Sequence, residues 1–240
     1  MGLTLANCHF TEEITFKRDG SGTFNVHMDM SHMMAAMSEM EANKQDTTSQ
    51  NEKVYEYRDT LIDFNEFLET YKDSMDALTP SEQSKLKSLK DIKIRMFMDE
   101  KNEVFIMDVF RDFNSIEELK DIQTQIKTAR QLQSDSGGES GDDIEDHTIA
   151  YSYTKKKFAR TVTMLELTEE ERQQFEDEKQ KAKMFNEEGL YKIKYRFPKK
   201  IKSTSLEGAT ISEDRHLLEY QVKMNDLIEN PTLLDFEVEF

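Results

Sequence analysis

Two alternating stretches in residues 10–30 constrain the fold of this chain more than any other feature. Residues 10–16 and 23–30 alternate, with apolar side chains at every second position except Glu12, on either side of the turn Asp19-Gly20-Ser21-Gly22. A period of two is that of a strand with one buried face, and a short glycine-containing connection predicts a hairpin. The positions expected to face inward are Phe10, Glu12, Ile14, Phe16, Phe24, Val26, Met28 and Met30.

The hairpin is followed by a helical pattern, and the strand, strand, helix order recurs in residues 92–129 and 149–185. Thr79, Ser115 and Thr168 each precede a glutamate by three positions, the spacing of a capping box at a helix start. The apolar spacing of residues 61–78 predicts a further helix of about five turns. The last fifty residues are mainly strand, with inward positions at Tyr191, Ile193, Tyr195, Phe197, Leu218, Tyr220, Val222, Leu234, Phe236, Val238 and Phe240.

These patterns predict an α+β fold in which helices pack on an antiparallel sheet built from hairpins. We expect a single domain over residues 9–240. Residues 134–146 are rich in Gly, Ser and acidic side chains and predict a mobile loop within that domain. Acidic oxygens bind calcium, but the spacing in this loop does not match that of an EF-hand.

Net charge and hydropathy limit what this chain can contact and how it can meet a membrane. The formal net charge of -17 disfavours nonspecific contact with nucleic acid or an anionic membrane surface, because both bind positive surfaces, so such contact would need a local basic patch. No run of about 18 apolar residues occurs, so the sequence predicts no transmembrane helix.

Cys8 is the only cysteine, so an intrachain disulfide is impossible. It ends the run Leu5-Ala6-Asn7-Cys8 and directly precedes the first alternating strand. That run resembles a lipobox, in which an aliphatic and a small residue precede the lipidated cysteine, although Asn7 departs from the pattern and residues 1–8 lack the basic and long apolar parts of a signal peptide. We expect residues 1–8 to be a lipobox-like remnant and Cys8 to carry a membrane anchor.

No motif for catalysis, cofactor binding or metal binding is present. A phosphate-binding glycine loop, a dinucleotide fingerprint, a Gly-x-Ser-x-Gly elbow and a zinc-ligand pair are all missing. His27, His32 and the nearby methionines could ligate copper(I), but the methionines fall on the predicted inward faces and His27 on the opposite one. We therefore expect no cofactor, no metal and no enzyme activity.

One local group of cations stands out on this acidic chain. Lys192, Lys194 and Arg196 share the polar side of a predicted strand, and Lys199 and Lys200 follow it. They could meet an anionic ligand or partner. Alternation alone also predicts polar side chains on the solvated side of a half-buried strand.

The two ends of the chain together resemble the LppM-like and related bacterial envelope lipoproteins. The matching features are Cys8, the first hairpin with its Asp-Gly-Ser-Gly turn, the Phe197-Pro198 strand end followed by residues 199–204, and the alternating residues 209–212 and 217–222. Tyr220 stands where that family usually has Trp, and the middle of this chain is more helical. The resemblance covers about a quarter of the chain and implies an envelope-anchored binding domain on the periplasmic or cell-surface side, with no catalytic residue.

The sequence therefore predicts a membrane-tethered domain of the bacterial envelope that binds a protein partner or an amphipathic ligand. Two alternatives stay open: an enzyme of unfamiliar type and a structural subunit of an envelope assembly. A histidine and an acid converging in a pocket would favour the enzyme, whereas an exposed apolar patch would favour the subunit.

Overall fold

The predicted hairpin forms the centre of the larger of two sheets. In the computed structural model, which describes residues 9–32, 34–35, 55–133, 146–185 and 189–240, β1 (His9–Phe16) pairs antiparallel with β2 (Gly22–Asp29). Ile14 and Phe24 are paired across the hairpin and are fully buried. The expected inward face is thus confirmed. His27 and Met28 lie on opposite faces, also as expected, because His27 bonds Asp108 at 2.7 Å while Met28 lies in the core.

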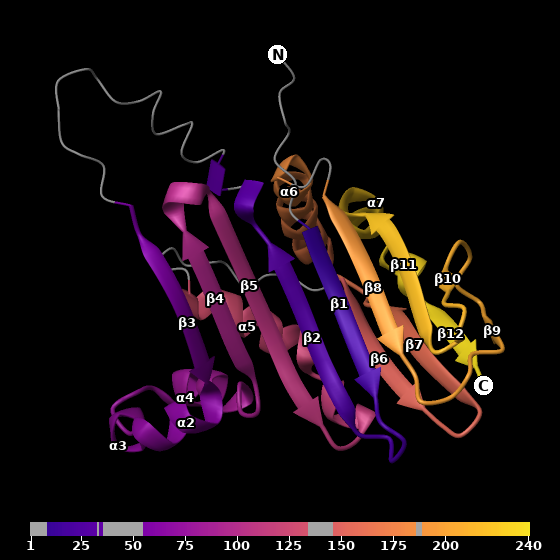
Figure 1. The fold of residues 1–240 in the computed structure, drawn as a ribbon. Helices are drawn as coiled ribbons and strands as arrows, with labels where there is room; N and C mark the ends of the chain where they lie inside the picture. The colour runs from indigo at the N-terminus through magenta and orange to yellow at the C-terminus, as the bar shows by residue number, and fades with distance from the viewer. Residues whose placement is uncertain (1–8, 33, 36–54, 134–145, 186–188) are drawn as a thin grey trace.

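The larger sheet has the order β10-β11-β8-β1-β2-β5-β4-β3 (Figure 1). Its pairs are antiparallel except one, since β1 and β8 run parallel over His9↔Leu190 to Thr15↔Arg196. The α+β class is confirmed, but the expectation of a purely antiparallel sheet is wrong. The remaining strands of this sheet are β3 (Tyr57–Asp63), β4 (Lys93–Asp99), β5 (Val104–Phe113), β8 (Leu190–Arg196), β10 (Thr210–Ile211) and β11 (Leu217–Lys223).

The smaller sheet has the order β6-β7-β12-β9 and lies behind the β1, β8 and β11 part of the larger sheet (Figure 1). Its strands are β6 (His147–Tyr153), β7 (Lys157–Met164), β9 (Ser203–Thr204) and β12 (Phe236–Glu239). Aromatic rings join the two sheets. Phe16 on β1 stacks on Phe197 at 5.3 Å and meets Phe158 on β7 edge-on at 5.6 Å.

Three helices stand beside the smaller sheet, behind the larger one (Figure 1). They are α5 (Ile122–Gln133), α6 (Glu169–Phe185) and α7 (Met224–Glu229), with the 3-10 turns η2 (Ile116–Leu119) and η3 (Pro231–Leu234). Sequence patterns did not predict α7 or η3, which interrupt the strand-rich end of the chain. Three further helices lie at one end of β3 and β4: α2 (Phe64–Thr70), α3 (Lys72–Met75) and α4 (Pro80–Ser88). The 3-10 turn η1 (Glu100–Asn102) joins β4 to β5.

Two local predictions are wrong. The expected five-turn helix over residues 61–78 is instead the end of β3 followed by the short helices α2 and α3. Leu61 lies in β3, because Asp63 accepts a bond from Asn65 N and starts α2 only after the strand has paired with β4. The Ser115 capping box does not form. The carboxylate of Glu118 accepts from Asn114 N and faces Arg111 instead, and Ser115 bonds the Glu117 side chain. The capping boxes at Thr79 and Thr168 are confirmed.

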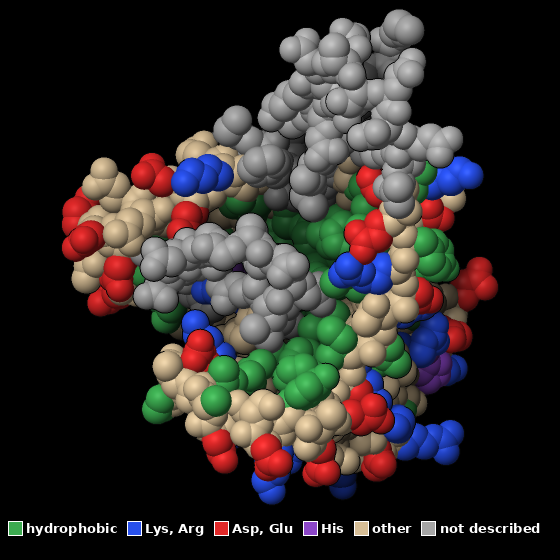
Figure 2. Space-filling model, turned by 90° about the vertical axis from the view of Figure 1, so that its left-hand side faces the viewer, with side chains coloured by type: hydrophobic (Ala, Val, Ile, Leu, Met, Phe, Trp, Pro, Cys, Tyr) green, Lys and Arg blue, Asp and Glu red, His purple; other side chains and the backbone are tan. Residues whose placement is uncertain are grey.

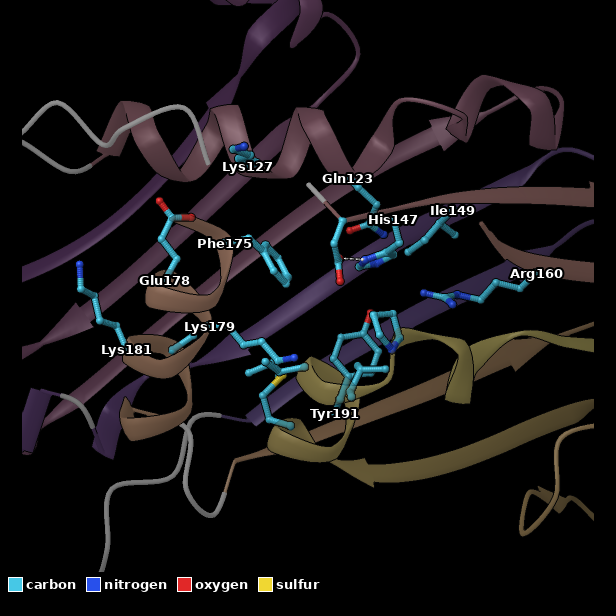
Figure 3. Close-up of a pocket in the computed structure, with 16 residues that line it drawn as sticks. Gln123, Lys127, His147, Ile149, Arg160, Phe175, Glu178, Lys179, Lys181 and Tyr191 are labelled. Atoms are coloured by element: carbon cyan, nitrogen blue, oxygen red, sulfur yellow. Dashed lines mark hydrogen bonds and ion pairs between the residues drawn. The ribbon is translucent and has the colours of Figure 1, made fainter. Parts of the chain in front are cut away.

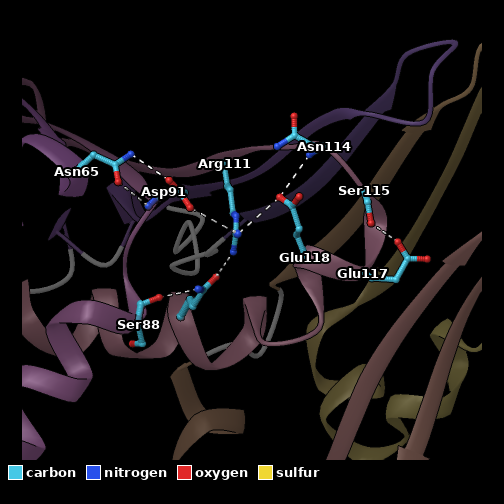
Figure 4. A network of polar contacts seen from close by, with 9 residues as sticks. Asn65, Ser88, Asp91, Arg111, Asn114, Ser115, Glu117 and Glu118 are labelled. Carbon is cyan, nitrogen blue, oxygen red and sulfur yellow. Dashed lines mark hydrogen bonds and ion pairs between the residues drawn. The ribbon is translucent and has the colours of Figure 1, made fainter.

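A largely buried arginine links α5 to the sheet. Arg111 on β5 donates to the Gln125 side chain at 3.1 Å, and Gln125 in turn donates to Ser88 O at 2.6 Å (Figure 4). Asp91 and Glu118 lie 3.9 and 3.8 Å from Arg111. These contacts tie α5, one wall of the site described below, both to the larger sheet and to the last residue of α4.

The surface between these layers is partly apolar. On the side of the molecule where β3 lies, hydrophobic side chains gather in a hollow bordered by charged side chains (Figure 2). None of the described helices is long and apolar enough to cross a membrane.

Candidate functional site

A glutamate lies in the core of the molecule. Glu12 on β1 has no solvent exposure, and its carboxylate accepts hydrogen bonds from three phenols. Tyr151 donates to Oε1 at 2.9 Å, Tyr195 also donates to Oε1, and Tyr191 donates to Oε2. A buried carboxylate is tolerated only when such donors replace water.

Strand register explains why these side chains meet. Tyr191 and Tyr195 flank Ile193, the direct partner of Glu12 on the parallel strand β8. Tyr151 reaches Glu12 from the smaller sheet, where it is the cross-strand partner of Arg160. The cluster therefore joins both sheets through one carboxylate. Burial, reinforced by the negative charge of Glu12, raises the pKa of all three tyrosines well above the ordinary value.

Arg160 completes this cluster and is 3% exposed. Its Nε lies 3.9 Å from Glu12 Oε1, and its Nη1 donates to Leu234 O at 2.8 Å. Nε has no hydrogen-bond partner among the described residues. Burial disfavours the charged guanidinium, but attraction to Glu12 outweighs this and raises the pKa of Arg160. The arginine therefore stays charged inside the protein.

A cavity of about 670 Å³ opens above the cluster. The side chain of Arg160 points into it towards Tyr191, and Phe175 points into it from α6 (Figure 3). Most of the wall is apolar. Its apolar lining consists of Ile149 on β6, Phe175 and Ala182 on α6, Tyr191 on β8, Met224, Leu227 and Ile228 on α7, and Pro231.

Polar side chains lie at a few places on the cavity wall. His147 Nδ1 and Asp146 Oδ1 are 2.6 Å apart at the start of β6. Lys179 on α6 is paired with Glu229 at 2.9 Å and with Glu176 at 3.5 Å. Lys127 and Lys181 also line the cavity. An apolar volume with a few placed polar groups is typical of a small-molecule site.

The cations singled out from the sequence do not join this site. Lys192, Lys194 and Arg196 lie on the outer face of β8, opposite Tyr191 and Tyr195. Lys194 pairs with Glu13 at 3.3 Å, and Arg196 lies 3.9 Å from Asp214. Lys192 borders a shallow hollow beside β11, Lys199 donates to Lys155 O at 2.6 Å, and Lys200 is exposed.

Other predicted sites fall partly or wholly outside the described residues. Cys8 does so, as does the acidic loop up to residue 145. Within the part of the chain that the structure describes, no group of three or more His, Cys, Asp or Glu is arranged to hold a metal. His27 bonds Asp108 on the outer face, away from Met28, so these two do not form the copper site considered as an alternative.

The sequence held a signal for the buried cluster. Glu12, Tyr151, Arg160, Tyr191 and Tyr195 all occupy inward positions of alternating strands. An acid and an arginine at inward positions of different strands need each other or other polar partners. Their convergence could not be predicted, because it depends on how the two sheets face one another.

Comparisons with known proteins identify no family. No protein-family model and no curated protein matches the chain. One solved structure is similar, the NMR structure of the folded domain of the Mycobacterium tuberculosis LppM protein, with a TM-score of 0.43 and 6% identity over 100% of this chain and 92% of that one. A likeness at this level carries no argument about the fold or the function of this chain.

Proposed function

We propose that the chain is a non-catalytic binding domain that takes an amphipathic small molecule into the cavity between α5, α6, α7 and β6. The observation that supports this is a cavity of about 670 Å³ with largely apolar walls and a buried polar cluster beneath it. That volume lies within the range of about 300–1,000 Å³ found for small-molecule sites. An apolar body would gain from leaving water, while polar groups at the wall would fix its orientation.

A neutral, solvatochromic dye tests this proposal directly. Nile red should bind with a blue shift, and Ala182→Phe should weaken the binding by narrowing the cavity. Ala77→Phe is the matched control, because Ala77 is exposed between α3 and α4 and does not line the cavity. Equal dye binding by the two variants would show that the cavity is not the binding site.

We further propose that Cys8 tethers this domain to a bacterial membrane, on the periplasmic or cell-surface side. Support comes from the lipobox-like run and from the position of Cys8 directly before β1, which starts at His9. Cells that express the gene should incorporate a labelled fatty-acid precursor into the wild-type protein and not into Cys8→Ser. Absence of label on the wild type would refute the tether.

The cations of the outer face fit an anionic lipid surface next to this tether. Lys192 is the register partner of Thr11, close to the start of β1, and Lys200 is exposed. Lys192→Glu/Lys200→Glu should weaken co-sedimentation with phosphatidylglycerol vesicles. The same charge change at Lys85 and Lys87 on α4 is the control and should have less effect.

A second candidate function rests on the hydrogen bond between His147 and Asp146 in the cavity wall. A histidine oriented by a carboxylate can act as a general base on water. Among the described lining residues there is no Ser, Thr or Cys to serve as a nucleophile. Hydrolysis of p-nitrophenyl esters that is lost in His147→Ala but kept in Lys181→Ala would favour this enzyme over the binding domain.

A further inference from the structure

The guanidinium of Arg160 has more donors than the described structure uses. An arginine carries five N–H donors, and those of Arg160 are buried together with the rest of its side chain. Nη1 donates to Leu234 O, whereas Nε has no hydrogen-bond partner among the described residues. Buried donors without acceptors are costly, and native proteins rarely keep them without a reason.

Glu12 does not supply the missing acceptor for Arg160 Nε. Its carboxylate already accepts from Tyr151, Tyr191 and Tyr195, and the 3.9 Å from Oε1 to Arg160 Nε is too long for a hydrogen bond. The two charges attract each other, but the phenols occupy the carboxylate oxygens. Tyr151 also interacts with the guanidinium, but Nε keeps no acceptor of its own among the described residues.

The side chain of Arg160 borders the cavity. Arg160 lines it and points towards Tyr191, below the apolar wall that α6 and α7 provide (Figure 3). An acceptor that entered from the cavity would reach the arginine with its polar end, and its apolar part would then contact Phe175, Leu227 and Ile228. The position of Arg160 thus sets a direction for any amphipathic occupant.

We propose that the occupant carries an anionic oxygen group, a carboxylate or a phosphate, which the guanidinium of Arg160 binds at the inner end of the cavity. This inference rests on the proposed function and adds the chemistry of the head group. A planar guanidinium matches both groups by paired N–H···O bonds, and charge-assisted bonds of this kind are stronger than bonds to a neutral acceptor. Lys127 and Lys181 also line the wall, where the carboxylates of Asp146 and Glu178 accompany them.

A molecule with a single alkyl chain is small enough for the cavity. About 670 Å³ suits one alkyl chain with a compact head group. A decanoate ion, decyl phosphate, methyl decanoate and decanol share one chain and differ only in the head group. Titrating each below its critical micelle concentration, with displacement of Nile red as the readout, isolates the contribution of the head group.

Decanoate or decyl phosphate should bind the wild type at least about tenfold more tightly than methyl decanoate and decanol. In Glu12→Gln/Arg160→Gln, which removes both buried charges together, this preference should disappear while decanol binds as before. Circular dichroism and a thermal melt establish that the double variant is folded. Arg160→Lys with Glu12 intact is a second variant. It should reduce the preference, because lysine keeps the positive charge but cannot form the paired N–H···O bonds of a guanidinium.

Each result has a separate meaning. Preference for decanoate alone or for decyl phosphate alone assigns the head group. Equal binding of all four ligands would overturn the anionic head group and leave the proposed function standing. Failure of the wild type to bind any of them, or Nile red, would overturn the proposed function as well.

Discussion

Glu12 and Arg160 belong to different sheets, yet their side chains lie 3.9 Å apart in the interior. Glu12 has no exposed surface and Arg160 is 3% exposed. Because neither charge meets water, the pair and its three tyrosines act as one polar unit between the sheets. Removing either residue alone therefore leaves the other charge buried without its partner, and this is how the pair affects stability.

Glu12→Leu should lower the free energy of unfolding by about 3–5 kcal/mol, because it strands a buried guanidinium and three phenols. Arg160→Met should also lower the free energy of unfolding, because it leaves the Glu12 carboxylate buried without the positive charge. The double variant Glu12→Leu/Arg160→Met should lose clearly less than the sum of the single losses. Urea unfolding of the three variants measures this, and simple additivity would show that the two charges are not coupled.

Alkaline pH should destabilise the fold through the tyrosines around Glu12. Burial, and next the charge of Glu12, raise the pKa of Tyr191 and Tyr195 well above 10, and that of Tyr151 moves in the same direction. In the unfolded chain these phenols ionise near 10, whereas in the folded protein they stay neutral. The stabilisation is therefore complete below about pH 10 and is lost as the pH rises towards the folded-state values.

Three such groups together should lower the free energy of unfolding by about 4 kcal/mol per pH unit above the unfolded pKa. Urea titrations between about pH 8 and 11 give the slope. Tyr191→Phe should reduce it by roughly a third, while Tyr57→Phe removes a phenol that is 67% exposed and should leave it unchanged. An unchanged slope in Tyr191→Phe would contradict this account.

The capping box of α6 should matter for the cavity as well as for stability. Glu171 N donates to Thr168 Oγ1 at 3.3 Å, and Thr168 N donates to the Glu171 carboxylate at 2.8 Å. Thr168→Ala should cost about 1 kcal/mol and weaken Nile red binding, since α6 supplies Phe175 and Ala182 to the wall.

Thr79→Ala is a close control for that variant. The box at Thr79 and Glu82 has the same distances, 3.3 and 2.8 Å, but caps α4 away from the cavity. The two variants should lose similar stability, and only Thr168→Ala should lose dye affinity. Equal loss of affinity would mean that the wall formed by α6 is not part of the binding site.

Two glycines of the first turn should respond differently to alanine. A Cβ at Gly22 would lie 2.3 Å from Thr15 O and 2.5 Å from Phe113 Cζ, so Gly22→Ala must displace the hairpin backbone. Gly20 has φ +92 but open space around it, so Gly20→Ala costs only the strained backbone, about 1 kcal/mol. Thermal melts should show the larger loss for Gly22→Ala, and a reversed order would contradict the packing at Phe113.

Local periodicity predicted the first hairpin and the capping boxes at Thr79 and Thr168, because each depends on residues close in sequence. It failed where contacts between distant segments decide the structure. Leu61 fits a helical stripe, but pairing of β3 with β4 places it opposite Arg95 in a strand. At Ser115 the helix signal was overridden by Arg111, which attracts the Glu118 carboxylate.

The candidate site was missed for the same reason. Periodicity placed Glu12, Tyr151, Arg160, Tyr191 and Tyr195 on inward faces but could not show which inward faces meet. The cavity also needs α7, a helix of six residues that follows β11 directly and has little periodicity to detect. The cation group, by contrast, was found because it lies within one short segment, and its role stays a prediction, as does the single domain over residues 9–240.

The parallel pairing of β1 with β8 has a consequence for the order in which the protein folds. β1 lies between β2 and β8, so the middle of the larger sheet joins residues 9–15 to residues 190–196. During synthesis the first hairpin can form early, but one edge of β1 and the carboxylate of Glu12 must wait until nearly the whole chain has left the ribosome. Contacts that distant in sequence slow folding, and the nascent protein has to keep an unpaired strand and a future buried charge in water until β8 arrives.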